Sequence, residues 1–436
     1  MSSPVPNPEE NLLNLQKWLQ QLTPHCEVSP DKIKVQETEY GGKGIFATSL
    51  IKPHQTLLKI PHSYLLNFTS IVKHITSFND TIKLPSTYGH VKVTTTPEDD
   101  ITRSFYSKLK LEELLALTSF QIVAMYLTLE TERAESSWWC PFIRMLPDSS
   151  DFRLSPLVWL YEEDSQSFDK LPLTTKAHAK RIYSNFCSDL GIITALLTKY
   201  ECISHFSKDQ FLWAWMCVNS RCLYMPLPQA HTTADNFTMA PFVDFINHSS
   251  QQQCVLKIDR TGFFVMSGTK GYEQQEELYL SYGAHSNEFL LCEYAFTLPE
   301  NEWNDLDISR EILALMEPFE IEWLKDMGYF GEYTISHDAS MSFRTEVAFA
   351  VLQERDHTSG SLKDNKRLAS FLNGGDLGSF YKNGRKSRIA GILEALKEIF
   401  QESSVLGSKG SNERQMVVGK LYKESLDIIE GHLNDL

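Results

Sequence analysis

The sequence predicts an α+β fold in which a β-rich part is interrupted by a helical block and followed by a helical C-terminal region. Two stretches, at about residues 30–60 and 240–285, carry short β-like runs separated by Gly and Pro. Segments with apolar residues at helical spacing lie between these stretches and again after Pro299. Strands so far apart in the chain can pair only if the intervening block folds as an insertion.

Local patterns place the individual elements. A first helix is expected at Pro8–Leu22, where the apolar side chains share one face behind a proline-rich start. Strands are expected at Lys32–Glu37, Gly44–Thr48, Thr56–Ile60, Cys254–Ile258, Gly262–Ser267 and Glu277–Tyr282, with a turn at Asp259–Thr261. Further helices are expected at Leu111–Arg133, Lys176–Tyr200 and Lys208–Arg221.

The composition is that of a globular protein with ample core material. Of the 436 residues, 42% are hydrophobic and 22% are charged, which argues against a disordered or fibrous chain. The formal net charge is −15, and an acidic protein is a poor match for the phosphate backbone of nucleic acids. A charge of this sign favours encounters with Lys- or Arg-rich polypeptides.

The cysteines and the hydropathy indicate a soluble protein of a reducing compartment. No two of the eight cysteines have the Cys-x-x-Cys spacing of a zinc knuckle, so buried free thiols are expected. The N-terminal segment lacks the basic and apolar regions of a secretory signal. No stretch reaches the roughly 20 apolar residues that span a bilayer.

Two of the candidate motifs are weak when taken alone. Gly41-Gly42-Lys43-Gly44 lies between two expected strands, where glycines allow a close approach to a ligand but more often form a hairpin turn. It lacks the third glycine and the following helix of a dinucleotide-binding fingerprint, which disfavours a nicotinamide cofactor. The apolar segment Ser137–Pro147 contains no nucleophile–base pair, and a structural role is the better interpretation.

A third motif places Asp244, Asn247 and His248 among bulky apolar residues. Such polar groups must form hydrogen bonds if they are buried, so they indicate either a structural network or a ligand site. A hydrolase built on Ser249 is disfavoured, because triad members usually come from distant positions and no nucleophile elbow is present. A metal site would need further ligands, and the sequence offers none in matching positions.

The fourth motif is Glu277–Gly283, followed by the aromatic-rich segment Asn287–Phe296. Leu278, Leu280 and Tyr282 alternate along the expected strand and share one of its faces. A tyrosine at the end of a strand, just before a glycine, can project into a cleft.

Together these segments resemble the SET-domain methyltransferases in which a helical insertion splits the SET fold. That family includes the Rubisco large-subunit methyltransferase and the ribosomal-protein lysine methyltransferases of fungi. The Gly-x-Gly, the Ser-x-Trp-x-Pro-Phe…Leu-Pro segment, the Asp-x-x-Asn-His block and the Tyr-Gly motif occur in the family's order. A Trp-Ala-Trp…Asn-Ser-Arg segment at residues 213–221 is most similar to the subgroup of SET-domain-containing protein four.

The resemblance implies an organisation and an activity. It predicts an N-terminal helix at 1–24, a SET domain at 25–300 with a helical insertion at about 62–210, and an all-α substrate-binding domain of the Rubisco-methyltransferase type at 301–436. The implied reaction moves a methyl group from S-adenosyl-L-methionine to a lysine of a ribosomal protein, a translation factor or a histone. Catalysis of such an in-line displacement consists largely of alignment and desolvation, and an aromatic-walled channel favours the uncharged amine.

The same resemblance implies the site residues. Tyr282 corresponds to the catalytic tyrosine. The residues implied to bind the cofactor are Gly42, Lys43, Gly44, Ser220, Asp244, Asn247, His248, Tyr282 and Phe296. Those implied to bind the substrate are Arg221, Asp244 and Tyr294, and no metal is implied.

Two positions depart from the family pattern, and two alternative functions stay open. Leu223 stands where relatives often carry an aromatic residue, and Tyr294-Ala295-Phe296 replaces the usual Tyr-Gly-Phe, so both changes bear on the number of methyl groups added. The alternatives are methylation of histidine on the same fold and an inactive SET module that binds peptides. We expect a cytoplasmic monomer, with the nucleus as a further compartment, that binds neither nucleic acid nor membranes.

Overall fold

The structure is a computed structural model whose described residues divide into two compact units. It describes residues 8–21, 27–28, 32–38, 42–89, 91–94, 100–227, 235–250, 253–357, 362–375, 378–408 and 412–436. The first unit comprises residues 1–153 and 182–284, and the second comprises residues 154–181 and 285–436. The boundary at residues 181 and 182 falls inside a long helix, α9 (Leu173–Lys199).

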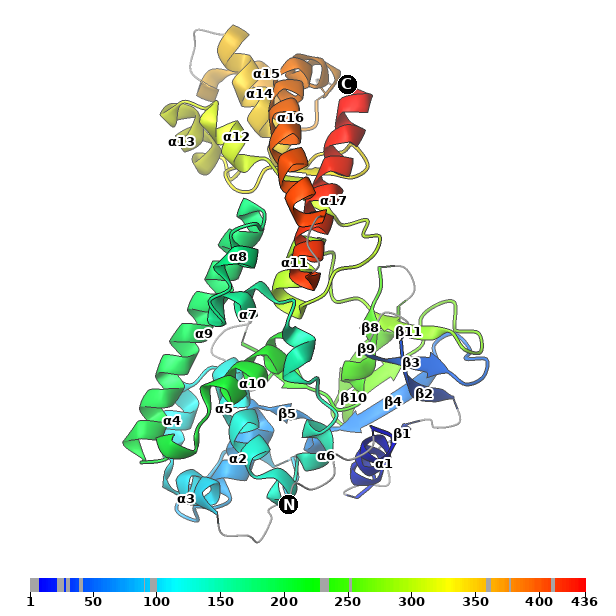
Figure 1. Cartoon of the computed structure of the whole chain (residues 1–436), viewed down its shortest axis with the longest axis vertical. Coiled ribbons are helices and arrows are strands. Elements are labelled where there is room, and N and C mark those ends of the chain that lie inside the picture. Colours follow the sequence, from blue (N-terminus) through cyan, green and yellow to red (C-terminus); the bar gives the residue numbers. More distant parts are fainter. Residues whose placement is uncertain are drawn as a thin grey trace. The chain divides into compact units, whose positions relative to one another are not determined.

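The first unit combines small sheets with a group of helices (Figure 1). Its strands are β1 (Glu27–Val28), β2 (Ile33–Glu37), β3 (Lys43–Ala47), β4 (Thr56–Pro61), β5 (Leu66–Asn67), β6 (Leu223–Tyr224), β7 (Phe237–Met239), β8 (Asn247–His248), β9 (Val255–Asp259), β10 (Gly262–Met266) and β11 (Glu277–Leu280). Its helices are α1 (Pro8–Leu19), α2 (Phe68–Thr76), α3 (Ile101–Lys108), α4 (Leu111–Ala116), α5 (Ser119–Glu132), α6 (Cys140–Ile143), the second part of α9, and α10 (Lys208–Arg221).

Strands from the two sides of the helical block pair with each other. The described strands form sheets in the orders β1-β4-β10-β9, β2-β3-β11-β8 and β5-β7-β6. In the first sheet Ile60 of β4 lies opposite Phe263 of β10. In the second sheet Ile45 of β3 lies opposite Leu278 of β11. These long-range pairs confirm that the β-rich parts form one fold, which a helical insertion splits.

Helix α5 is the centre of the insertion. Its residues from Gln121 to Glu130 are all buried, as expected for a helix that is apolar on every side. It packs against α2 and α10 and against strands β5 and β7. The single helix predicted for residues 111–133 is two helices, because Leu117 and Thr118 are extended. The Thr118 side chain accepts a hydrogen bond from the Gln121 N–H and begins α5 as its N-cap.

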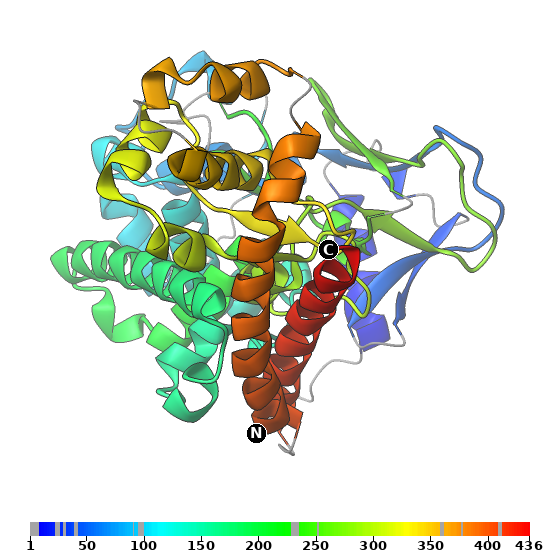
Figure 2. The same cartoon turned by 90° about the horizontal axis from the view of Figure 1, so that it is seen from above.

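The second unit is mainly helical. Its helices are α7 (Pro156–Tyr161), α8 (Ser165–Phe168), the first part of α9, α11 (Asn287–Tyr294), α12 (Ser309–Ala314), α13 (Pro318–Asp326), α14 (Phe343–His357), α15 (Lys366–Leu372), α16 (Gly378–Ser408) and α17 (Glu413–Asp435). The long helices α16 and α17 lie side by side (Figures 1 and 2). The predicted helical character after residue 300 is confirmed. The structure adds a two-stranded ribbon of β12 (Asp305–Asp307) and β13 (Thr334–Ser336), which was not predicted.

The cysteines and the hydropathy of the helices can be compared with the expectations from the sequence. The cysteines within the described ranges are free, as predicted, and Cys26 lies outside those ranges. Most of them are buried, whereas Cys187 is exposed. Among the helices of the described residues, none combines the length and the apolar character needed to cross a membrane.

Gly262 provides a test of the pairing of β4 with β10, which joins the two β-rich parts of the chain. A Cβ atom at this position would lie 2.2 Å from the carbonyl oxygen of Ile60, and the φ angle of Gly262 is +155°. Gly262→Ala should therefore lower the free energy of unfolding by about 2 kcal/mol or more. The matched control is Gly191→Ala in α9, where a Cβ meets no atom within 4 Å and should raise that free energy by up to about 1 kcal/mol. Denaturant titration measures both, and equal effects would contradict the close approach of β4 and β10.

Candidate functional site

The glycine motif, the Asn-His pair and Tyr282 gather around strand β11, whereas Ser220 and Arg221 lie at the end of α10. β11 pairs with β3 in antiparallel fashion and with β8 in parallel fashion, with Tyr279 opposite Asn247 and Leu280 opposite His248. The glycine motif, the Asn-His pair and the Tyr-Gly motif, which are widely separated in the sequence, therefore meet at one sheet. The strand predicted for Glu277–Tyr282 ends at Leu280, so Tyr282 lies just beyond it.

The backbone of the glycine motif is in contact with Asn247. The Asn247 side chain donates a hydrogen bond from Nδ2 to the carbonyl oxygen of Lys43, 3.1 Å away. A Cβ atom on Gly44 would lie 3.1 Å from the same Nδ2 and 2.4 Å from Glu277 Oε1. Gly42 has a φ angle of +77°, which favours glycine. Gly44 is thus required by close approach and Gly42 by its backbone conformation.

His248 and Tyr282 form a fixed pair. Their rings stack with centroids 5.1 Å apart and an interplanar angle of 21°. The Tyr282 N–H lies 3.1 Å from His248 Nδ1, and the same ring nitrogen lies 3.3 Å from the carbonyl oxygen of Leu280. The Tyr282 hydroxyl donates to the carbonyl oxygen of Ile246 at 2.8 Å. Tyr282 is therefore held at its backbone, its ring and its hydroxyl by the segment that contains β8.

Ser220 and Arg221, at the end of α10, differ in their hydrogen-bond partners. The Ser220 hydroxyl donates to the carbonyl oxygen of Met216 within its own helix, at 2.7 Å. Arg221 Nη1 donates to the carbonyl oxygen of Asp244 at 2.6 Å and lies 3.7 Å from Asp244 Oδ2. Arg221 Nε is buried and has no hydrogen-bond partner among the described residues. The buried Nε–H of Arg221 can therefore donate a hydrogen bond to a bound molecule.

Asp244 is the most perturbed acidic group of the site. Its side chain is 2% exposed, and neither carboxylate oxygen has a hydrogen-bond partner within the described part of the chain. Burial raises the pKa of Asp244 to about 6, although the Arg221 charge opposes that rise. A buried carboxyl that accepts no side-chain hydrogen bond is costly for folding, which is typical of a functional site.

The backbone before Asp244 is strained. Phe242 adopts a φ angle of +74° while its side chain is almost fully buried. This conformation is unusual for a bulky residue and costs about 1–3 kcal/mol. It leads into the short helical turn Val243–Phe245, which carries Asp244. The strain is thus located at the segment that positions the perturbed carboxyl.

Tyr294 and Phe296 belong to the second unit. Tyr294 is the last residue of α11, and its ring centroid lies 6.1 Å from that of Phe296. Burial raises the pKa of the Tyr294 phenol. Ala295, which replaces the usual glycine, has a φ angle of +64° and ends α11 in the left-handed conformation. The glycine of the family pattern is therefore explained by this backbone conformation, which costs an alanine about 1–2 kcal/mol.

The tryptophan-containing motifs form part of the structural core. Ser137 Oγ donates to Glu130 Oε2 at 2.5 Å, and Trp139 Nε1 donates to the Tyr126 hydroxyl at 3.0 Å. In α10, Trp215 Nε1 donates to Asp189 Oδ2 at 2.9 Å. These motifs hold the insertion together, in agreement with the structural interpretation of Ser137–Pro147.

The second departure from the family pattern is at β6. Leu223 is half-buried, whereas the neighbouring Tyr224 is 61% exposed. The exposed Tyr224 side chain therefore does not take the place of an aromatic residue at position 223.

Sequence reasoning gave Glu277 no role, although it lies within the fourth motif. Its Oε1 accepts a hydrogen bond from Asn247 Nδ2 at 2.7 Å, and its Oε2 accepts one from the Tyr279 hydroxyl at 2.8 Å. The only signal in the sequence is the alternation that places Glu277 and Tyr279 on one strand face. The contact with Asn247 depends on the pairing of β8 with β11, which the sequence does not state.

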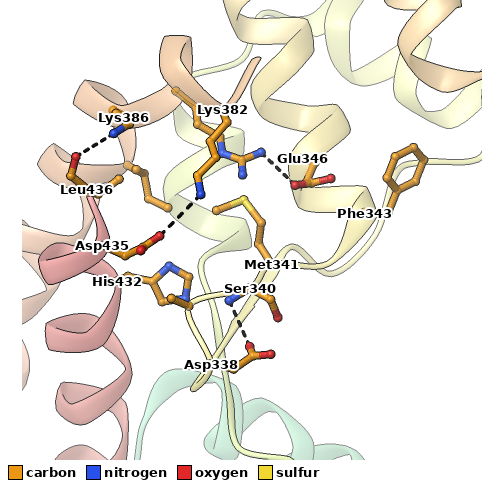
Figure 3. A pocket seen from close by; sticks show the side chains of 13 residues that line it. Asp338, Ser340, Met341, Phe343, Glu346, Lys382, Lys386, His432, Asp435 and Leu436 are labelled. Carbon is orange, nitrogen blue, oxygen red and sulfur yellow. Dashed lines mark hydrogen bonds and ion pairs between the residues drawn. The ribbon is translucent and has the colours of Figure 1, made fainter. Parts of the chain in front are cut away.

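A pocket of about 470 Å³ lies in the second unit and contains none of the predicted site residues (Figure 3). Its basic side chains face acidic ones: Lys382 lies 3.7 Å from Asp435, and Arg385 lies 3.1 Å from Glu346. Met341 and Phe343 add apolar surface. Because these charges neutralise one another, the pocket does not select a ligand of one charge, and the candidate site is the one at β11.

Comparison with known proteins supports the same location. The SET-domain family model matches residues 42–283. A second family model, the C-terminal domain of ribosomal lysine N-methyltransferase 2, matches residues 304–435. The first match contains every candidate residue of the first unit, and the second covers most of the helical unit that follows.

Relatives and a solved structure extend the likeness over the chain. Ribosomal lysine N-methyltransferase 2 of Saccharomyces cerevisiae is 29% identical, over 93% of this chain and 95% of the relative. SET domain-containing protein 4 of Homo sapiens is 25% identical, over 71% of this chain and 66% of the relative. The structure of Rubisco LSMT bound to AdoMet has a TM-score of 0.59 at 16% identity, covering 100% of this chain and 92% of that one. The comparisons therefore confirm the resemblance that the four motifs indicated, and they confirm the predicted fold class.

Asp244→Asn tests the assignment of a buried, perturbed carboxyl. Because its pKa is raised to about 6 from the ordinary 3.8, native Asp244 keeps a proton that the unfolded chain has already lost. Its contribution to stability is therefore complete below about pH 4 and is lost as the pH rises through about 6, amounting to roughly 3 kcal/mol. The Asn variant should lose less free energy of unfolding than the wild type between about pH 4.5 and about pH 7.5. Identical pH dependence in urea titrations of the two proteins would contradict this assignment.

Proposed function

The chain belongs to the SET-domain family, and from this premise we propose that it is an S-adenosyl-L-methionine-dependent protein-lysine N-methyltransferase. The observation that carries the proposal is the meeting of Asn247, His248 and Tyr282 where β8 pairs with β11. The yeast relative named ribosomal lysine N-methyltransferase 2 supports the activity, and the structure of Rubisco LSMT bound to AdoMet supports the cofactor.

The residues present fit the cofactor. The absence of a side chain at Gly44 lets the backbone of the glycine motif lie against the Asn247 amide. Arg221 Nε lacks a hydrogen-bond partner among the described residues, and a guanidinium is suited to an oxygen acceptor of a bound molecule. We assign Gly42, Lys43, Gly44, Asn247 and His248 to the cofactor. Ser220, Asp244 and Phe296 complete the proposed cofactor set.

The chemistry requires alignment more than acid–base catalysis. When bound, S-adenosyl-L-methionine supplies a methyl group activated by its sulfonium. The amine must attack in line, so groups that hold its direction accelerate the reaction. We assign this role to Tyr282, whose phenol is held by the Ile246 carbonyl and by the His248 ring.

The incoming lysine must also reach the site as an uncharged amine. Apolar and aromatic surroundings disfavour the ammonium and lower its pKa. We assign Tyr294 to the wall of the lysine channel, together with Arg221 and Asp244 at the substrate side. Their closeness to the substrate is a prediction from the family resemblance.

The proposed substrate is a Lys-rich segment of a ribosomal protein. The name of the yeast relative supports this class, and a net charge of −15 favours encounters with basic polypeptides. We propose the helical unit after residue 300 as the substrate-binding domain and the cytoplasm as the main location, with the nucleus as a further one. We propose a monomer that acts on its protein substrate without binding nucleic acid or membranes.

The activity can be tested directly with the purified full chain. It should transfer the methyl group of isotopically labelled S-adenosyl-L-methionine to a protein of a ribosomal fraction, and mass spectrometry should find the label on lysine. Absence of both cofactor binding and transfer would exclude the proposed activity. Label on histidine would replace lysine as the acceptor, and cofactor binding without transfer to any protein would favour the inactive module.

Tyr282→Phe should separate catalysis from cofactor binding. Loss of the hydroxyl removes the group that orients the amine, so the turnover number should fall by about 100-fold. The affinity for S-adenosylhomocysteine, measured by calorimetry, should change by less than about threefold, because the ring still stacks on His248. Tyr333→Phe is the matched control, since Tyr333 is buried in the core of the second unit. Unchanged turnover in Tyr282→Phe would remove Tyr282 from the assigned role.

A further inference from the structure

The carboxylate of Glu277 connects two groups at the β8–β11 pair. Oε1 accepts from Asn247 Nδ2 at 2.7 Å, and Oε2 accepts from the Tyr279 hydroxyl at 2.8 Å. Glu277 and Tyr279 are two residues apart on β11, so their side chains share one face of the sheet. Asn247 lies opposite Tyr279 in the parallel register, which brings its amide to the same face. The carboxylate therefore contacts one residue of its own strand and one of the neighbouring strand.

These contacts determine the direction of the Asn247 amide. Both groups that surround its nitrogen, the Lys43 carbonyl and the Glu277 carboxylate, are hydrogen-bond acceptors. An amide oxygen on this side would meet two oxygens and be repelled. Nδ2 must therefore face Lys43 and Glu277, and Oδ1 must face the opposite way. The hydrogen bond to the carboxylate is charge-assisted and is the stronger of the two constraints.

The glycine motif leaves the space that this arrangement needs. A Cβ atom at position 44 would lie 2.4 Å from Glu277 Oε1 and 3.1 Å from Asn247 Nδ2. Any larger residue would push the carboxylate away from the amide. The absence of a side chain at Gly44 thus serves the Glu277–Asn247 contact as well as the approach of a ligand.

We propose that Glu277 is a positioning residue for the cofactor, which acts by fixing the Asn247 amide with Oδ1 turned towards the ligand. An amide oxygen accepts hydrogen bonds, so the group it selects is an N–H donor. S-adenosyl-L-methionine carries such donors on its ammonium and on its adenine ring. This inference rests on the proposed function, and it adds a residue to which neither the family resemblance nor the motif analysis assigned a role.

Calorimetry with S-adenosylhomocysteine as the probe tests this inference. Glu277→Ala should raise the dissociation constant at least about tenfold, because the amide is free to rotate. Glu277→Gln should keep it within about threefold of the wild type, since the glutamine oxygen can still accept from Asn247 Nδ2. Glu276→Ala is the matched control, because it removes the same charge from the neighbouring residue and should leave the affinity unchanged.

An exchange of donor and acceptor gives a second test that does not depend on the alanine variant. Asn247→Asp places two carboxylates against each other and should weaken binding of S-adenosylhomocysteine more than about tenfold. Adding Glu277→Gln to that variant supplies a donor opposite the new carboxylate, and should recover at least about threefold of the loss. In kinetic assays the Glu277→Ala effect should fall on the KM for the cofactor, with kcat within about threefold.

The outcomes separate this inference from the proposed function. If the wild type fails to bind S-adenosylhomocysteine, the proposed function and the inference fall together. If the wild type binds and Glu277→Ala binds equally well, only the inference is wrong. It is also wrong if Glu277→Gln brings no recovery in the Asn247→Asp background, because a purely structural carboxylate would not show this exchange.

Discussion

The pairing of β11 with β3 on one side and with β8 on the other is the constraint on which the site depends. It is formed by segments around residues 45, 247 and 279, which no local interaction could bring together. Once the three strands are aligned, the Asn247 amide reaches the Lys43 carbonyl, and the Tyr282 backbone reaches the His248 ring. The hydrogen bonds of Asn247, and that between the Tyr282 backbone and His248, thus depend on the register of this one strand. Near the two ends of the insertion, strands β5 and β7 pair with each other.

The polar groups around these strands are satisfied unequally, and the differences indicate where ligands belong. His248 Nδ1, the Tyr282 hydroxyl and the Asn247 nitrogen all have protein partners. Asp244 and Arg221 Nε, in contrast, retain bonding capacity while buried. Folding could have been made more stable by replacing them with apolar residues, since unpartnered buried polar groups are costly. Their cost is consistent with a site that is completed by bound molecules.

The tryptophans of the sequence motifs stabilise the fold and are not among the proposed site residues. Trp139 and Trp215 donate hydrogen bonds to Tyr126 and Asp189 and rigidify the insertion. This rigidity is useful to the site, because α10 ends at Arg221 and directs its guanidinium to the segment of Asp244. The ordered motifs therefore include both candidate site residues and the structural residues that position them.

The sequence by itself determined the elements whose signals are local. Helix α10 has the bounds that its apolar spacing predicts, the turn after β9 lies where Asp259–Thr261 indicated it, and the order of four short motifs indicated the family. The break before α5 was missed, because the cap formed by Thr118 outweighs a continuous apolar pattern.

Only the tertiary structure decided which side chains act together. Asn247 contacts the Lys43 carbonyl across 204 positions and Glu277 across 30, and both contacts depend on strand register. The burial of Asp244, and with it the raised pKa, depends on what packs around that segment. Register and burial are set by the sum of many distant contacts, and for that physical reason a pattern of neighbouring residues does not contain them.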